Sequence, residues 1–169
     1  MMIIINTKKT HELKKKEIEN ITKLKNQHWN YGEKRQIKWF KKYIKKNDIH
    51  NILLFKNKII GYTCLRIRKV HSEKYKKYLY FDTLIINKKF RKLSFSKKLM
   101  IFNNKIIKKN KKISFLITTK KLEKFYEKFG WKTLNKSNFR VIDHKTQVNL
   151  GMIFNNYQKL NNFSFYLYE

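Results

Sequence analysis

The stretch that decides the fold is residues 82–100, which read DTLIINKKFRKLSFSKKLM. It reads as the end of a strand that turns directly into a helix, and the junction carries little besides backbone amides, hydroxyls and cations. The first N–H groups of a helix have no intrahelical partners, and the helix dipole adds partial positive charge there. The junction therefore predicts a phosphate site, with an ordinary capped helix on a lysine-rich surface as the alternative.

A second fragment, residues 124–131, reads KFYEKFGW. In this order and spacing the two fragments resemble the GNAT superfamily of acetyl-CoA-dependent N-acetyltransferases. The resemblance covers residues 59–131. It implies an enzyme that transfers acetyl directly from acetyl-CoA, its co-substrate, to a primary amine held in the same ternary complex.

The loop before the helix carries the cofactor site that the resemblance implies. In the GNAT pattern this loop reads Arg or Gln, two residues, Gly, one residue, then Gly or Ala. Here Arg91 takes the first position, and both small positions are serine. A serine in place of glycine requires a backbone conformation that a Cβ tolerates, while its hydroxyl could cap the helix or bind a phosphate oxygen. The implied loop residues are Arg91, Lys92, Leu93, Ser94, Phe95, Ser96 and Lys97.

Two other segments complete that implied cofactor site. The main chain of Leu84, Ile85 and Ile86 would bind the pantetheine arm and help to polarise the thioester carbonyl. Thr119 stands where many relatives have an asparagine, so it would keep one hydrogen bond to the arm.

Tyr126 is the candidate general acid. It precedes Gly130 by four residues, the spacing at which the family places a tyrosine close to the thioester sulfur. A phenol with a pKa near ~10 is only slightly weaker as an acid than a thiol near ~8.5, so it could donate as negative charge builds on sulfur. A tyrosine half-buried beside neighbouring phenylalanines is the alternative interpretation.

Asp82 is the candidate general base. It lies nine residues before Arg91, where spermidine/spermine-type acetyltransferases of the superfamily carry a catalytic glutamate. A carboxylate inside a strand is unfavourable and costly to bury without partners, so its presence at this position calls for a functional or structural explanation. Because aspartate is shorter than glutamate, we expect it to act through a water molecule. A carboxylate paired with a lysine or a hydroxyl is the alternative.

Residues 28–32 form a loop too rich in large side chains to be only a connector. His28, Trp29 and Tyr31 are candidate substrate-binding residues, since they could stack on a sugar or a base, and His71 could line the acceptor cleft. Exposed loop histidines without a function are the alternative. No metal-ligand spacing and no nucleophile elbow occurs in the sequence, so we expect neither a metal nor a covalent mechanism.

Hydrophobic periodicity predicts an α/β (α+β) fold with a GNAT-like mixed, mostly antiparallel sheet of six or seven strands and helices on both faces. One strand–helix–strand crossover should be parallel. We expect residues 1–169 to form a single acetyltransferase domain. The predicted helices are residues 11–27, 33–46, 94–109 and 122–129, and the predicted strands are residues 2–6, 51–55, 59–68, 78–86, 113–118, 131–134, 147–154 and 163–168. The second and third of these strands should form a hairpin with Asn57 in its tight turn.

The strongly basic composition raises the question of whether the protein binds nucleic acid. The chain carries 42 Lys and Arg against 11 Asp and Glu, a formal net charge of +31. The lysines are scattered along every segment and arginines are few, a pattern that AT-rich codons impose, so nucleic acid is a disfavoured partner. A basic RNA- or ribosome-associated module with a decayed cofactor site is the alternative from another functional class.

The basic field should attract anionic ligands and repel polycations. The favoured acceptor is therefore a small anionic or neutral amine, such as an amino sugar or a sugar nucleotide, with an aminoglycoside- or protein-directed transferase as the alternative. Cys64 is the only cysteine, and no stretch approaches a membrane span. We expect a cytoplasmic enzyme with no membrane partner, and the sequence leaves a homodimer open.

Overall fold

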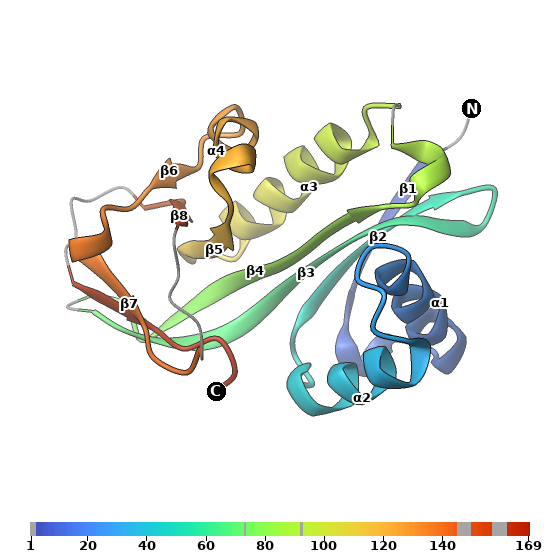
Figure 1. Cartoon of the computed structure of the whole chain (residues 1–169), viewed down its shortest axis with the longest axis horizontal. Coiled ribbons are helices and arrows are strands. Elements are labelled where there is room, and N and C mark those ends of the chain that lie inside the picture. Colours follow the sequence, from blue (N-terminus) through green and yellow to red (C-terminus); the bar gives the residue numbers. More distant parts are fainter. Residues whose placement is uncertain (1–2, 73, 92, 145–149, 157–161) are drawn as a thin grey trace. The chain divides into compact units, whose positions relative to one another are not determined.

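The computed structural model describes residues 3–72, 74–91, 93–144, 150–156 and 162–169. The chain divides into two compact units, and Figure 1 shows their elements in chain order. The first unit comprises Met1–Arg66 and Thr83–Asn103, and the second comprises Ile67–Asp82 and Asn104–Glu169. The single domain expected over residues 1–169 stays a prediction.

The first unit contains an antiparallel sheet. β1 (Ile3–Lys9) pairs with β2 (Ile49–Phe55), and β2 pairs with β3 (Lys58–His71), whose first half belongs to this unit. Lys56 and Asn57 connect β2 to β3 with φ angles of 46° and 59°. Positive φ at both central residues is the geometry of the tight type I′ hairpin turn. The predicted hairpin with Asn57 in its turn is confirmed.

Helices cover both faces of this sheet. α1 (Lys15–Asn26) and α2 (Glu33–Tyr43), which lie together in Figure 1, share a hydrophobic cluster with Ile52 of β2. The first part of α3 (Phe95–Lys109) packs in a different cluster with Leu53, the next residue of β2. Because neighbouring residues of a strand point to opposite faces, the two sets of helices lie on opposite faces, as predicted.

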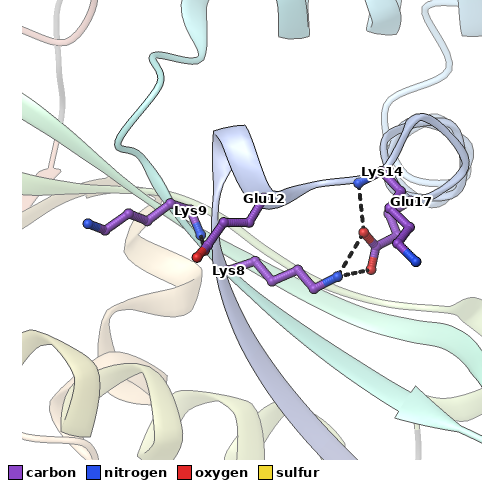
Figure 2. Close-up of polar contacts among 5 residues, drawn as sticks. All are labelled: Lys8, Lys9, Glu12, Lys14 and Glu17. Carbon is purple, nitrogen blue, oxygen red and sulfur yellow. Dashed lines mark hydrogen bonds and ion pairs between the residues drawn. The ribbon is translucent and has the colours of Figure 1, made fainter.

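The chain between β1 and α1 is held by two carboxylates (Figure 2). Glu12 accepts a hydrogen bond from the backbone N–H of Lys9 at 2.5 Å and closes the short 3-10 helix Thr10–Glu12. Leu13 is then extended. The prediction that the helix begins at His11 is therefore wrong, because this local hydrogen bond ends the first helical turn.

Glu17 defines the actual start of α1. It accepts a hydrogen bond from the backbone N–H of Lys14 at 2.8 Å, and it binds Nζ of Lys8 at 2.7 and 2.9 Å (Figure 2). Burial raises the pKa of the Glu17 carboxyl, but the hydrogen bonds from Lys8 and Lys14 outweigh burial, and the net pKa is lowered. A glutamate at the third helical position that bonds back to the preceding N–H is half of a capping box.

His50 is a buried titratable residue of the first unit. Its Nε2 lies 2.8 Å from Oγ1 of Thr10, and its Nδ1 lies 2.7 Å from the hydroxyl of Tyr62. Its ring stacks on Phe40. Burial lowers the pKa of His50 to about 4, the carboxylate of Asp48 raises it, and the positive charge of Lys25 lowers it further. The imidazole is therefore neutral at pH 7.

The backbone turns into α3 through Ser94. Its φ is +56°, in the left-handed region that favours glycine, and its carbonyl accepts the N–H of Lys98 at 3.3 Å. On the N-terminal side of the loop the 3-10 helix Lys88–Phe90 is capped by Asn87, whose side chain accepts the N–H of Lys89 at 3.1 Å. At the glycine position of the GNAT pattern, a residue with a Cβ thus adopts a conformation that glycine favours.

The two strands of the predicted parallel crossover pair within the second unit. β4 (Lys77–Ile86) pairs in parallel with β5 (Ser114–Thr118), but only through Leu79 with Ser114 and Tyr80 with Phe115. The hydroxyl of Ser114 adds a 2.7 Å hydrogen bond to the carbonyl of Leu79. On its other edge β5 pairs with β8 as far as Thr118, whereas its ladder with β4 ends at Tyr80.

The remaining strands of this unit are short. β8 (Leu150–Phe154) pairs antiparallel with β5 and with β6 (Lys132–Thr133), while α4 (Lys120–Glu127) follows β5. β7 (Phe139–Val141) pairs in parallel with β9 (Phe163–Phe165). The described residues thus contain nine strands, and β7 is the one that the sequence did not predict, because three residues are too few for a readable alternation. Residues 147–149 of one predicted strand lie outside the described residues.

The end of the chain shows why β9 is shorter than predicted. The carboxylate of Asp143 accepts the backbone N–H of Leu167 at 2.6 Å and that of Tyr168 at 2.7 Å. These amides therefore bind a side chain instead of a neighbouring strand. The prediction of a strand as far as Tyr168 is wrong for this reason, and the strand ends at Phe165.

His50 should make stability depend on pH. A histidine in the unfolded chain has a pKa near ~6.5, so below that pH the unfolded chain binds more protons than the folded one. The contribution is full above pH ~6.5 and is lost as pH falls through about 4, where roughly 3 kcal/mol is at stake. We expect urea unfolding from pH 7 to 4.5 to show a smaller loss of stability in His50→Gln than in wild type. The exposed control His71→Gln should follow wild type, and equal pH slopes in all three proteins would contradict the prediction.

Ser94 should be a site of backbone strain. Because an L-residue with positive φ is strained, Ser94→Gly should raise the free energy of unfolding by up to about 1 kcal/mol. Ser96→Gly is the matched control, since it places glycine inside α3 and should lower that free energy by about 0.5 kcal/mol. Urea unfolding at constant pH measures both. A Ser94→Gly variant as destabilised as Ser96→Gly would show that position 94 carries no strain.

Candidate active site

Arg91 connects the predicted cofactor loop to the loop after α1. Its Nε donates to the carbonyl of Ile86 at 3.3 Å, and its Nη2 lies 3.3 Å from Nδ1 of His28. Burial lowers the pKa of His28, and the charges of Arg91 and Lys88 lower it further, so the neutral ring accepts this hydrogen bond at pH 7. The structure therefore brings together a predicted cofactor-binding residue and a predicted substrate-binding residue, a contact that sequence spacing alone does not reveal.

The other loop positions divide into exposed and buried side chains. Leu93 is 51% exposed, and the side chains of Ser94 and Lys97 are also exposed. The side chain of Phe95 is buried in the core of the first unit, so only its main chain is available to a ligand. Ser96 is half-buried, and Lys92 lies outside the described residues.

The predicted pantetheine segment is the end of β4. The side chains of Ile85 and Ile86 are buried in two different hydrophobic clusters, and Leu84 packs against the second of them. These side chains anchor the end of β4 in the hydrophobic core, so a ligand would contact the backbone groups of this segment. Thr119, in the second unit, is exposed and precedes α4 without a side-chain capping bond.

Tyr126 lies on α4 and is 9% exposed. Its ring makes edge contacts with Phe81 of β4 at 6.2 Å and with Trp131 at 6.3 Å between ring centroids. Burial raises the pKa of Tyr126 to about 12, and its hydroxyl has no hydrogen-bond partner among the described residues. The phenol is therefore protonated over the whole physiological pH range.

The turn after α4 fixes the position of this tyrosine. The carbonyl of Tyr126 accepts the N–H of Phe129 at 2.9 Å and that of Trp131 at 3.3 Å. Gly130 makes the turn with φ of +81°, a left-handed conformation common after a helix C-terminus. Asn104 of α3, which sequence reasoning missed, also binds this turn. The available signal was a pair of asparagines, residues 103–104, in the middle of a helix with an apolar face.

Asp82 is half-buried on β4, one residue after the Phe81 that contacts Tyr126. It lies beyond the last position at which β4 pairs with β5. Asp82 therefore lies just past the point where the ladder between two parallel strands ends, a place in a sheet where ligands commonly bind.

The predicted aromatic loop after α1 has a cationic neighbour. His28 and Trp29 are in edge contact at 4.6 Å, and Nζ of Lys25 lies 5.8 Å from the Trp29 ring. The carbonyl of Trp29 accepts a hydrogen bond from Gln36 of α2 at 2.9 Å. Tyr31 is 63% exposed. In this loop the backbone of Trp29 is therefore tied to α2, whereas the side chain of Tyr31 is exposed to solvent.

His71 lies elsewhere in the fold, in the second unit. It lines an open cavity of about 450 Å³ at the loop between β3 and β4, and its ring contacts Tyr166 at 5.2 Å. Asp82 and Tyr126 do not line this cavity. The structure therefore does not bring His71 together with the two candidate catalytic residues.

No group of three or more His, Cys, Asp and Glu side chains in the described part of the chain is arranged to hold a metal ion. Among the described helices, none has the length and apolar character needed to cross a membrane.

Comparisons with known proteins identify the family. A family model described as the acetyltransferase (GNAT) domain matches residues 14–146, most of the chain. No curated protein matches the chain at a significant level. Among solved structures the fold is similar to Escherichia coli ElaA, with a TM-score of 0.67 at 13% identity over 90% of this chain and 99% of that chain.

Two further solved structures carry cofactor groups. The PaiA N-acetyltransferase of Thermoplasma acidophilum, in complex with coenzyme A, has a TM-score of 0.60 at 16% identity over 90% of this chain and 98% of that chain. Arabidopsis thaliana Naa50, in complex with a bisubstrate analogue of CoA and a peptide, has a TM-score of 0.60 at 17% identity over 89% of this chain and 97% of that chain. The chain belongs to the GNAT family of N-acetyltransferases and is an acyltransferase.

Proposed function

We propose that the protein transfers acetyl from acetyl-CoA to the primary amine of a small molecule, by direct attack in a ternary complex. The observation that carries the proposal is the left-handed backbone at Ser94. It is the conformation that glycine favours, at the glycine position of the GNAT loop, kept here despite a Cβ. A strained residue ahead of a helix is maintained where the exposed amides of that helix have a use.

The cofactor would bind along the loop and the end of β4. The first amides of α3, the hydroxyl of Ser94 and the cations of Arg91, Lys92 and Lys97 are suited to a pyrophosphate. Leu93, Phe95 and Ser96 would contribute main-chain groups, and the backbone of residues 84–86 would bind the pantetheine arm together with Thr119. Bound acetyl-CoA supplies the thioester that the amine attacks.

Tyr126 would donate a hydrogen bond to the sulfur as the thioester breaks. Its pKa of about 12 lies above that of a thiol near ~8.5, so complete proton transfer to the thiolate is uphill. Donation becomes stronger as negative charge grows on sulfur, which favours the transition state over the ground state. Because the hydroxyl has no other partner among the described residues, it is available for this role.

Asp82 would remove the proton from the attacking ammonium through a water molecule. The half-buried carboxylate lies beyond the short β4–β5 ladder, where a substrate can approach the strand. Its short side chain favours a relay over direct contact with the amine. His28, Trp29 and Tyr31 would hold the acceptor by stacking, and His71 would join them only if the acceptor extends to the β3–β4 loop.

The charge of the chain favours an acceptor that is anionic or neutral, such as an amino sugar or a sugar nucleotide. Eleven acidic residues against 42 basic ones offer few carboxylates to hold a polycation. A protein-directed transferase is the second candidate, because one similar fold is bound to a CoA–peptide analogue. We further propose a single domain and a cytoplasmic location, consistent with one buried free cysteine, Cys64.

The catalytic assignments predict a loss of turnover in two variants. Tyr126→Phe should lower turnover by roughly 10²-fold, because the hydrogen bond to sulfur is lost while the cofactor still binds. Asp82→Asn should lower turnover by a similar factor, because an amide cannot accept the proton of the acceptor amine. Steady-state rates of thiol release, with acetyl-CoA affinity from calorimetry, measure both. The matched controls are Tyr75→Phe and Glu127→Gln, and wild-type turnover in both test variants would refute both roles.

The acceptor assignment predicts the order of a substrate panel. Thiol release from acetyl-CoA should be faster with phosphorylated or nucleotide-linked amino sugars than with spermidine, aminoglycosides or lysine-rich peptides, because the basic field steers anions inward. Added salt should narrow the difference, since screening removes the long-range part of the discrimination. A preference for polyamines or aminoglycosides would overturn the acceptor class and leave acetyl transfer standing, whereas no transfer to any amine would overturn the function.

A further inference from the structure

The side chain of Asn104, on α3, forms two hydrogen bonds to the turn that follows α4. Its Nδ2 donates to the carbonyl of Phe129 at 2.8 Å, and its Oδ1 accepts the indole N–H of Trp131 at 3.1 Å. Asn104 is 9% exposed, and Trp131 is 1% exposed. One amide thus satisfies a partly buried carbonyl and a buried indole at the two sides of Gly130.

These two hydrogen bonds act on the same turn that carries Tyr126. The carbonyl of Tyr126 receives the N–H groups of Phe129 and Trp131, so the residues that Asn104 holds are the residues that close the end of α4. The Trp131 ring also contacts the ring of Tyr126 and, at 5.7 Å, the ring of Phe81. Any rotation of the indole would change the packing around the phenol.

We propose that Asn104 is a positioning residue for acetyl transfer, which sets the place of the Tyr126 hydroxyl through Phe129 and Trp131. The inference depends on the proposed role of Tyr126. The hydrogen bonds of the Asn104 side chain go to Phe129 and Trp131, so its effect on Tyr126 is transmitted through the turn and the indole. An asparagine fits this task because a single side chain both donates and accepts.

The test compares Asn104→Ala with Asn110→Ala. Asn110 lies just after α3, the helix that carries Asn104. Among the described residues its side chain binds the carbonyl of Ile106, at 2.8 Å, so Asn110→Ala controls for the loss of an asparagine near the C-terminal end of α3. With the best acceptor of the panel, Asn104→Ala should lower kcat roughly 10-fold, with KM for acetyl-CoA within about 2-fold of wild type. Asn110→Ala should leave both constants within about 2-fold.

A double-mutant cycle separates positioning from general destabilisation. In a Tyr126→Phe background, Asn104→Ala should lower kcat by no more than about 2-fold, because the hydroxyl that it positions is already absent. An equal loss of kcat in both backgrounds would overturn the proposal and leave Asn104 with a purely structural role.

A second variant keeps the test valid if Asn104→Ala does not fold. Asn104→Asp retains an oxygen for the indole of Trp131 but loses the donor to the carbonyl of Phe129 until the carboxyl is protonated. Its kcat relative to wild type should therefore rise as pH falls. A ratio that is unchanged or falls over the same pH range would count against the proposal.

Nuclear magnetic resonance gives a readout that needs no acceptor. The Trp131 indole resonance, assigned by its loss in Trp131→Phe, and the Tyr126 ring resonances, assigned by their loss in Tyr126→Phe, should both shift in the Asn104 variants and not in Asn110→Ala. If wild type transfers no acetyl group, the proposed function fails while this readout still decides the positioning. Unchanged Tyr126 resonances in a folded Asn104 variant would overturn it.

Discussion

The short parallel pairing of β4 with β5 is the constraint on which the second unit depends. Two parallel strands need a long connection, and here α3 supplies it. The ladder joins only two residue pairs, with the Ser114 hydroxyl reinforcing the carbonyl of Leu79. Because pairing ends at Tyr80, the next residues of β4 are released from β5. The β4–β5 ladder therefore ends well before the end of β4 at Ile86.

Phe81, the first residue of β4 beyond the end of this ladder, belongs to an aromatic cluster that surrounds Tyr126. The ring of Phe81 packs against those of Tyr126 and Trp131. The same packing removes water from the phenol and raises its pKa to about 12. A buried phenol of this kind is a strong candidate for a hydrogen-bond donor and a poor one for a group that must ionise. The burial that shapes the fold therefore also restricts the role that Tyr126 can take.

The sequence predicted those parts of the molecule that carry strong local signals. The β2–β3 hairpin, the helices on both faces and the parallel crossover are consequences of periodicity and of the Asn57 turn, and the structure confirms them. Ends of elements were missed where one side chain captured backbone amides, as Asp143 does at Leu167. The contact of Arg91 with His28 and the grip of Asn104 on Trp131 join residues far apart in sequence, and no spacing rule in a single sequence encodes them.

The loop before α3 shows how strain points to use. This chain has only four glycines, and Gly61 and Gly151 are required by packing, since a Cβ at either would lie within 3.0 Å of neighbouring side chains. Gly130 supplies a left-handed turn, yet Ser94 adopts a similar φ without the help of glycine. A substitution that relieved this strain would need no change in packing, because the side chain of Ser94 is exposed. Asn57 shares this left-handed conformation in the β2–β3 turn, but Ser94 adopts it directly before a helix, where a hydroxyl can serve as a cap.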